Sequence, residues 1–173
     1  AGGICYVGTR GGSSSWRIKR VDMTGSVPTV TTVVDADDCG WAIPVDGHGD
    51  GVTAPRAQLC GDSALALTND GSTLYATNLR SSTGYIRRID TATGYVTTIA
   101  GGPRGNDDTI DGALTFAQFH STYGIALMPD QMSLLVTQDG NDGNEHIAVR
   151  RIPLINPCPP PPSPPPPLEP PDA

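Results

Sequence analysis

Long apolar and helical segments are missing from this sequence of 173 residues. No apolar run approaches the roughly 18 residues that a membrane-spanning helix needs, so we expect no membrane span. No longer stretch keeps apolar side chains at the i, i+3, i+4, i+7 spacing of an amphipathic helix. Threonine and valine instead recur in short runs, and the chain has 21 glycines and 17 prolines. This composition is typical of strands joined by tight turns, and it predicts an all-β chain.

Basic residues are also scarce. The chain has 11 lysines and arginines against 18 aspartates and glutamates, which gives a formal net charge of -7. Proteins that bind nucleic acid need a basic face for the phosphate backbone, so we expect no nucleic-acid partner. The sequence begins at Ala1 without a Met or an apolar leader, which predicts a mature or excised chain.

Common catalytic motifs are absent as well. The sequence contains no G-x-S-x-G, no H-E-x-x-H, no P-loop and no dinucleotide-binding glycine pattern. Its histidines, His48, His120 and His146, are isolated from one another. They could form a metal set only if the fold assembled them, and we interpret them as ordinary loop histidines. We therefore expect neither an enzyme nor a cofactor.

Three acidic loops, residues 35–38, 46–51 and 139–145, raise the question of calcium, which prefers oxygen ligands. The last of them has its glycines at the wrong places for an EF-hand loop and lacks the final glutamate. Asp-Gly and Asn-Gly pairs are also usual in tight turns. We interpret these loops as turns and expect no metal site.

Closely spaced cysteine pairs, which a structural zinc site needs, are missing too. The cysteines are instead an even, widely spaced set of four, which predicts disulfides and an oxidising compartment. Three pairings are possible. We favour Cys39 with Cys60, which would close a long loop, and Cys5 with Cys158, which would tie the first strand to the end of the last.

Repetition is the strongest positive signal. The segment "SALALTNDGSTLYATN" aligns without a gap with "YGIALMPDQMSLLVTQ", 60 residues further on. A second motif occurs three times, as "WRIKRVD", "GYIRRID" and "AVRRIP". Each unit is thus a succession of antiparallel strands, which is typical of propeller blades. The predicted strands number three, four and three in successive units: 4–8, 16–22 and 29–34; 63–68, 73–78, 84–90 and 95–100; 123–128, 133–138 and 147–153.

The second motif also places arginines at matching positions: Arg87 and Arg88 in one copy, Arg150 and Arg151 in another. These side chains could form a rim for an anionic ligand. We prefer a structural role, in which they bridge neighbouring blades through carboxylates such as Asp90.

In family terms, the succession "GDGVTAPRAQL", "ALALTNDGSTLYATN" and "GYIRRIDTATGYVTTIAGG" resembles the NHL repeat. The resemblance implies four-stranded β-propeller blades over residues 1–156. The strands amount to about two and a half blades, whereas propellers usually have four to eight. Such an incomplete ring leaves sheet faces and edges to be covered by other subunits, by glycans or by further blades of a longer propeller.

The chain changes character at residues 157–173, where "CPPPPSPPPPLEPP" follows the last predicted strand. Proline fixes φ and lacks an N–H, so polyproline II is expected, with a length on the order of 45 Å. The Ser-Pro-Pro-Pro-Pro unit resembles the hydroxyproline-rich, extensin-like modules of plant and green-algal wall glycoproteins. That resemblance makes Ser163 a candidate for O-glycosylation and the neighbouring prolines candidates for hydroxylation and O-glycosylation: Pro159, Pro160, Pro161, Pro162, Pro164, Pro165, Pro166 and Pro167.

These features together predict an extracellular structural glycoprotein of a cell surface, cell wall or matrix. Its expected partners are other copies or subunits of the assembly and O-linked glycans. The alternative is a ligand- or protein-binding module cut from a complete propeller, and a propeller lyase or esterase is the third interpretation.

Overall fold

The computed structural model describes residues 3–11, 15–36, 59, 64–80, 83–102, 109–139 and 147–154. These residues form ten β-strands and one short 3-10 helix, with no α-helix among them. The all-β prediction is confirmed. The elements are β1 (Ile4–Gly11), β2 (Ser15–Asp22), β3 (Thr29–Ala36), β4 (Leu65–Leu67), β5 (Thr73–Arg80), β6 (Thr83–Asp90), β7 (Val96–Ala100), η1 (Leu114–Phe116), β8 (Thr122–Leu127), β9 (Ser133–Gln138) and β10 (Ala148–Pro153).

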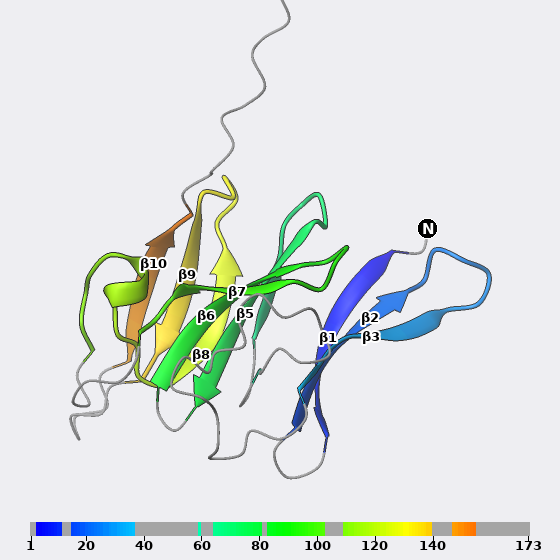
Figure 1. Cartoon of the computed structure of the whole chain (residues 1–173). Coiled ribbons are helices and arrows are strands. Elements are labelled where there is room, and N and C mark those ends of the chain that lie inside the picture. Colours follow the sequence, from blue (N-terminus) through cyan, green and yellow to red (C-terminus); the bar gives the residue numbers. More distant parts are fainter. Residues whose placement is uncertain are drawn as a thin grey trace, which may run out of the picture.

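The strands make three antiparallel sheets, each from strands that follow one another in the chain. The first sheet has the order β1-β2-β3, the middle sheet β4-β5-β6-β7 and the third sheet β10-β9-β8. Figure 1 shows the middle sheet lying between the other two. The predicted grouping of three, four and three strands is therefore confirmed, with ends that differ by a few residues. The predicted proline-rich rod and its boundary after residue 156 lie outside the described residues.

The first sheet matches β5, β6 and β7 of the middle sheet, because both contain the same β-bulge. The register of β2 with β3 shifts after Ile18, and the register of β6 with β7 shifts after Ile86. The basic residue that follows each isoleucine contacts a threonine on the next strand: Lys19 donates to Thr32 at 3.2 Å. Its counterpart Arg87 donates to Thr98 at 2.8 Å.

The third sheet matches β4, β5 and β6 instead. Thr77 on β5 accepts a hydrogen bond from the Ala64 amide at 2.9 Å. Thr137 on β9, 60 residues later in the sequence, accepts one from the Gly124 amide at 2.8 Å. The sequence repeat is thus a repeat of hydrogen-bonded hairpins.

The turns of these two hairpins also contact each other. Gly71 and Gln131 occupy equivalent left-handed positions, with φ of 73° and 57°. This conformation is easy for glycine and costs a residue with a Cβ on the order of 1 kcal/mol. The Gln131 side chain offsets this cost by accepting the Asn69 amide of the neighbouring turn at 2.8 Å. The middle and third sheets are therefore joined at their turns as well as by their faces.

The hydrophobic core has two layers, one on each face of the middle sheet. Three consecutive β5 residues, Leu74, Tyr75 and Ala76, are all at most 7 % exposed, because the strand is covered on both sides. One apolar cluster joins the first sheet to the middle sheet, and the other joins the middle sheet to the third. Leu59 and Phe119, from the matching "AQL" and "AQF" segments, belong to the first and second clusters respectively.

Residues 109–119, which include η1, form a wedge between the middle and third sheets. The Gly84 amide of β6 donates to the Phe119 carbonyl at 2.9 Å, and the Gly101 amide donates to the Leu114 carbonyl at 3.1 Å. The approach at Gly84 is close: a Cβ there would lie 2.4 Å from the His120 carbonyl oxygen. Only glycine lets the wedge come this near to the strand.

The first prediction concerns this contact. Gly84→Ala should lower the free energy of unfolding by at least about 2 kcal/mol, because the new methyl group meets backbone that cannot move aside cheaply. Gly25→Ala is the matched control, since a Cβ at Gly25 meets nothing nearer than 3.7 Å. Urea unfolding of the two variants measures the difference. Equal stability of both would show that the wedge does not pack on β6.

The second prediction concerns acid. The Thr68 hydroxyl donates to the Asp70 carboxylate at 2.6 Å and lowers the pKa of Asp70 below its ordinary value of 3.8. A pKa lowered by folding stabilises the protein above the ordinary value, and this contribution is lost as the pH falls through the folded-state pKa. Asp70→Asn should therefore reduce the loss of stability between about pH 5 and pH 2, measured by unfolding at several pH values. Asp130→Asn is the control in the equivalent turn, where Met128 and Met132 carry no hydroxyl. An unchanged acid profile in Asp70→Asn would contradict the assignment.

Candidate functional site

Of the predicted disulfide cysteines, only Cys5 lies among the described residues. It is half-buried on β1, and the part of the chain that the structure describes contains no second cysteine with which it could pair. Its predicted partner Cys158 and the other predicted pair, Cys39 and Cys60, lie outside the described residues, so both pairings stay predictions. The candidate modification sites Pro159, Pro160, Pro161, Pro162, Ser163, Pro164, Pro165, Pro166 and Pro167 lie outside them too.

One of the three histidines can be placed. Both ring nitrogens of His120 are buried and find no hydrogen-bond partner among the described residues. His48 and His146 lie outside the described residues, as do most of the acidic loops. Within the described ranges, no group of three histidine, cysteine or carboxylate side chains is arranged to hold a metal ion. The same ranges contain no apolar helix of membrane-spanning length.

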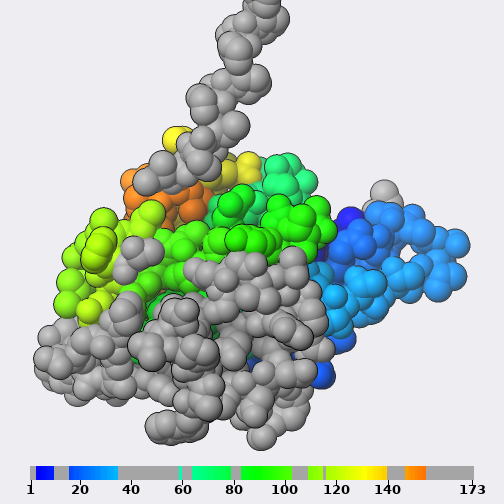
Figure 2. Space-filling model, viewed as in Figure 1, coloured from blue at the N-terminus to red at the C-terminus, as the bar shows by residue number. Residues whose placement is uncertain are grey.

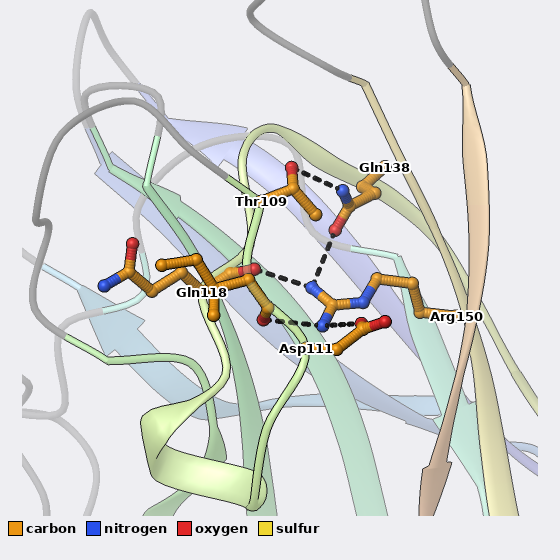
Figure 3. A network of polar contacts seen from close by, with 6 residues as sticks. Thr109, Asp111, Gln118, Gln138 and Arg150 are labelled. Carbon is orange, nitrogen blue, oxygen red and sulfur yellow. Dashed lines mark hydrogen bonds and ion pairs between the residues drawn. The ribbon is translucent and has the colours of Figure 1, made fainter.

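The most developed polar arrangement surrounds Arg150, whose side chain extends from β10 to the wedge (Figure 3). Its Nη1 donates to the Gln118 carbonyl at 2.6 Å, and its Nη2 donates to the Ile110 carbonyl at 2.8 Å. Nη2 also forms an ion pair with Asp111 Oδ1 at 2.6 Å. The guanidinium thus binds the carbonyls of both residues that form the isolated β-bridge, Ile110 and Gln118.

Further contacts hold the same guanidinium in place. Its carbon lies 4.3 Å from the centroid of the Phe119 ring, within the range of a cation–π interaction. Nη1 lies 3.3 Å from Gln138 Oε1, while Gln138 Nε2 donates to Thr109 at 2.9 Å. Gln138 is only 2 % exposed, so its amide is fixed between the arginine and the start of the wedge. Sequence reasoning missed Gln138 and Thr109, because no short-range pattern connects residues 29 positions apart.

A pocket of about 380 Å³ lies beside this network. It is lined by the wedge, by β10, which is an edge strand of the third sheet, and by Ala100 of β7. The Arg150 side chain is only 11 % exposed, and Asp111 and two carbonyls already take up its donors. Arg150 therefore offers little free positive charge to an anionic ligand, while the exposed Arg151 also lines the pocket. Its lining residues are Ala100, Asp111, Gly112, Leu114, Ala117, Phe119, Val149, Arg150, Arg151, Ile152 and Pro153.

The matching arginines divide into two kinds. Arg87 and Arg150 lie on the same faces of their sheets as their buried cross-strand partners, Ala76 and Val136 respectively. Arg87 is itself fully buried. Arg88 and Arg151 are exposed. The Arg150 contacts agree with the structural role that we preferred over a ligand rim, although the carboxylate is Asp111 rather than Asp90.

Two sheet faces are left open among the described residues. We call the side of each sheet that corresponds to Leu74 and Ala76 its front face, and the side that corresponds to Tyr75 and Ile86 its back face. The front face of the middle sheet packs on the back face of the first, and the front face of the third packs on the back face of the middle sheet. No described sheet packs on the front face of the first sheet or on the back face of the third. Figure 2 shows the first sheet, in blue, at one end of the molecule and β10, in orange, on the opposite side.

No protein-family model matches the chain, and no curated protein matches it. The resemblances to NHL repeats and to extensin-like modules therefore stay predictions.

The third prediction tests the Arg150 network. Arg150→Lys should lower the free energy of unfolding by roughly 2–4 kcal/mol, because a lysine cannot reach two carbonyls and a carboxylate with one ammonium group. Arg88→Lys is the control, since Arg88 is exposed at the neighbouring repeat position, and it should change stability by less than about 0.5 kcal/mol. Thermal and urea unfolding provide the comparison. A loss as small as that of the control would mean that Arg150 does not hold the wedge.

Proposed function

We propose that this chain is an extracellular structural glycoprotein. Its repeated sheets pack, blade against blade, with other subunits or with glycans in a cell wall, a matrix or a surface filament. The proline-rich segment that follows is a hydroxylated and O-glycosylated rod. The domain builds contacts and the rod acts as a stiff spacer between them.

The observation that carries the proposal is the pair of open sheet faces at the two ends of the stack. Val30 on the first sheet and Val149 on the third are 59 % and 64 % exposed, although the matching side chains of the middle sheet are buried. Apolar faces of this kind mark interaction surfaces in soluble proteins. A structural subunit that joins its neighbours through sheet faces accounts for them.

The composition of the chain supports the setting. Four widely spaced cysteines suit an oxidising compartment, and a Ser-Pro-Pro-Pro-Pro unit suits a wall or surface glycoprotein. The sequence has no Asn-x-Ser/Thr sequon, so its glycans would be O-linked. The net charge of -7 agrees with a partner other than nucleic acid.

A ligand- or protein-binding module from a complete NHL-like β-propeller is the second candidate. The recurring bulge and the contact of β4 with β8 favour it, because successive blades of a propeller repeat such features around a ring. A polypeptide in the native source that carries further copies of the repeat would support this candidate. A lyase or esterase activity would in addition require a metal or an acid–base cluster.

The fourth prediction tests the proposal on protein purified from its native source without reduction. Intact mass should exceed 18.0 kDa in steps of hydroxyl and of pentose or hexose. Glycopeptide mass spectrometry should place these additions on residues 159–167, and non-reducing peptide maps should show two disulfides. An unmodified tail with four free thiols would overturn the proposal and favour the binding module.

A further inference from the structure

The open front face of the first sheet has the same construction as the buried front face of the middle sheet. The registers match, since Cys5 is opposite Val21 as Leu74 is opposite Ile89. The apolar positions correspond as Cys5 to Leu74, Val7 to Ala76, Val21 to Ile89 and Val30 to Val96. All four are apolar in both sheets, and the polar pair Lys19 and Thr32 corresponds to Arg87 and Thr98, so this face has the side chains of a packing surface.

Exposure is what distinguishes the two faces. Ala76 and Val96 are 0 % exposed beneath the first sheet, whereas Val7 and Val30 at the same positions are 43 % and 59 % exposed. Burial of such side chains contributes on the order of 25 cal/mol per Å² of apolar surface. These positions of the first sheet therefore form an apolar surface that no described sheet covers, although the first sheet has no described strand that corresponds to β4.

The open back face of the third sheet shows the opposite half of the same interface. Leu135 corresponds to Tyr75 and Val149 to Ile86, both buried in the middle sheet. Ala126 on β8 continues the apolar stripe and is exposed. The stack of three sheets thus has a free front face at one end and a free back face at the other.

We propose that these two faces bind each other in different copies of this chain, so that the copies assemble head to tail. The inference rests on the proposed structural function and names a second copy as the partner. The chain already makes this front-to-back contact twice internally, between the first and middle sheets and between the middle and third sheets. An interface of two unlike faces is heterologous, and repetition of it builds a filament or a ring.

Lys19 of the first sheet corresponds to Arg87 of the middle sheet, and each donates to a threonine of its own sheet. The residue that suits a contact without a wedge is Ile147. The Gly84 position, which the wedge approaches closely, is Ile147 in the third sheet, and Ile147 is 78 % exposed. Its side chain would fill space that the wedge fills inside the chain.

The charge distribution adds an expectation about salt. The positions named on the two faces carry no carboxylate, so the net charge of -7 lies elsewhere on each copy. Like charge opposes association over a distance of about 10 Å at 0.1 M salt, and salt screens it. Association should therefore strengthen as the salt concentration rises.

The experiment is sedimentation velocity on the full chain, with one charge placed on either face. Wild-type protein should form species larger than a dimer as its concentration rises. Val30→Glu blocks the front face and Val149→Glu blocks the back face, so each variant alone should remain a monomer, with affinity reduced at least tenfold. A 1:1 mixture should form a dimer and nothing larger, because each variant keeps the face that the other has lost.

Val27→Glu is the matched control. Val27 is 72 % exposed in the turn between β2 and β3, and this variant should assemble like the wild type. The dimer in the mixture also shows that both variants are folded, and circular dichroism of each variant checks this independently. Association of either single variant at wild-type strength, or a folded mixture that stays monomeric, would overturn the head-to-tail interface.

These outcomes are separable from failure of the proposed function. Monomeric wild-type protein with a glycosylated proline segment would refute copy-to-copy packing and leave the structural glycoprotein standing. Head-to-tail assembly of a chain whose native tail is unmodified would support the interface and refute the glycoprotein rod.

Discussion

The structure depends on the burial of both faces of its middle sheet. A strand that packs on one side alternates apolar and polar residues, but β5 has Leu74, Tyr75 and Ala76 in succession, all buried. Neither cluster would form without the neighbouring sheet, because each draws its side chains from two sheets. The unit of stability is therefore the interface between two sheets and not the single sheet, and a sheet with only one neighbour has one face that still requires a partner.

The wedge shows how polar backbone is accommodated in such an interface. A loop between two apolar faces must find partners for its carbonyls and amides, or each of them costs free energy. Gly84 admits the Phe119 carbonyl on one side, and Arg150 binds the Ile110 and Gln118 carbonyls on the other. The arginine is therefore part of the packing of the sheets. The need to satisfy the wedge carbonyls explains the arginine at this position of β10, and no ligand has to be invoked for it.

Local patterns predicted the strands well, because strand and turn chemistry act over a few residues. The repeat at a shift of 60 correctly paired the hairpins that end at Thr77 and Thr137. The contacts between sheets could not be read in this way. The Asn69–Gln131 and Arg150–Asp111 contacts join residues 62 and 39 positions apart, and neither belongs to a periodic pattern. An Asp-Gly pair precedes both "AQL" and "AQF" in the sequence, and this recurrence is a signal that could have indicated a fixed role for the loop ahead of β8.

One difference within the repeat distinguishes the third sheet, which has three strands among the described residues, from the middle sheet, which has four. Asp90 accepts the Ala92 and Thr93 amides and so shapes the turn from β6 into β7. The matching residue at the end of β10 is Pro153, which has no carboxylate to cap a turn. Pro153 also has no N–H to donate, and proline on an edge strand opposes the addition of further strands. Growth at the edge is thus disfavoured, while the apolar back face around Val149 stays open. An assembly built from this chain would extend through its faces.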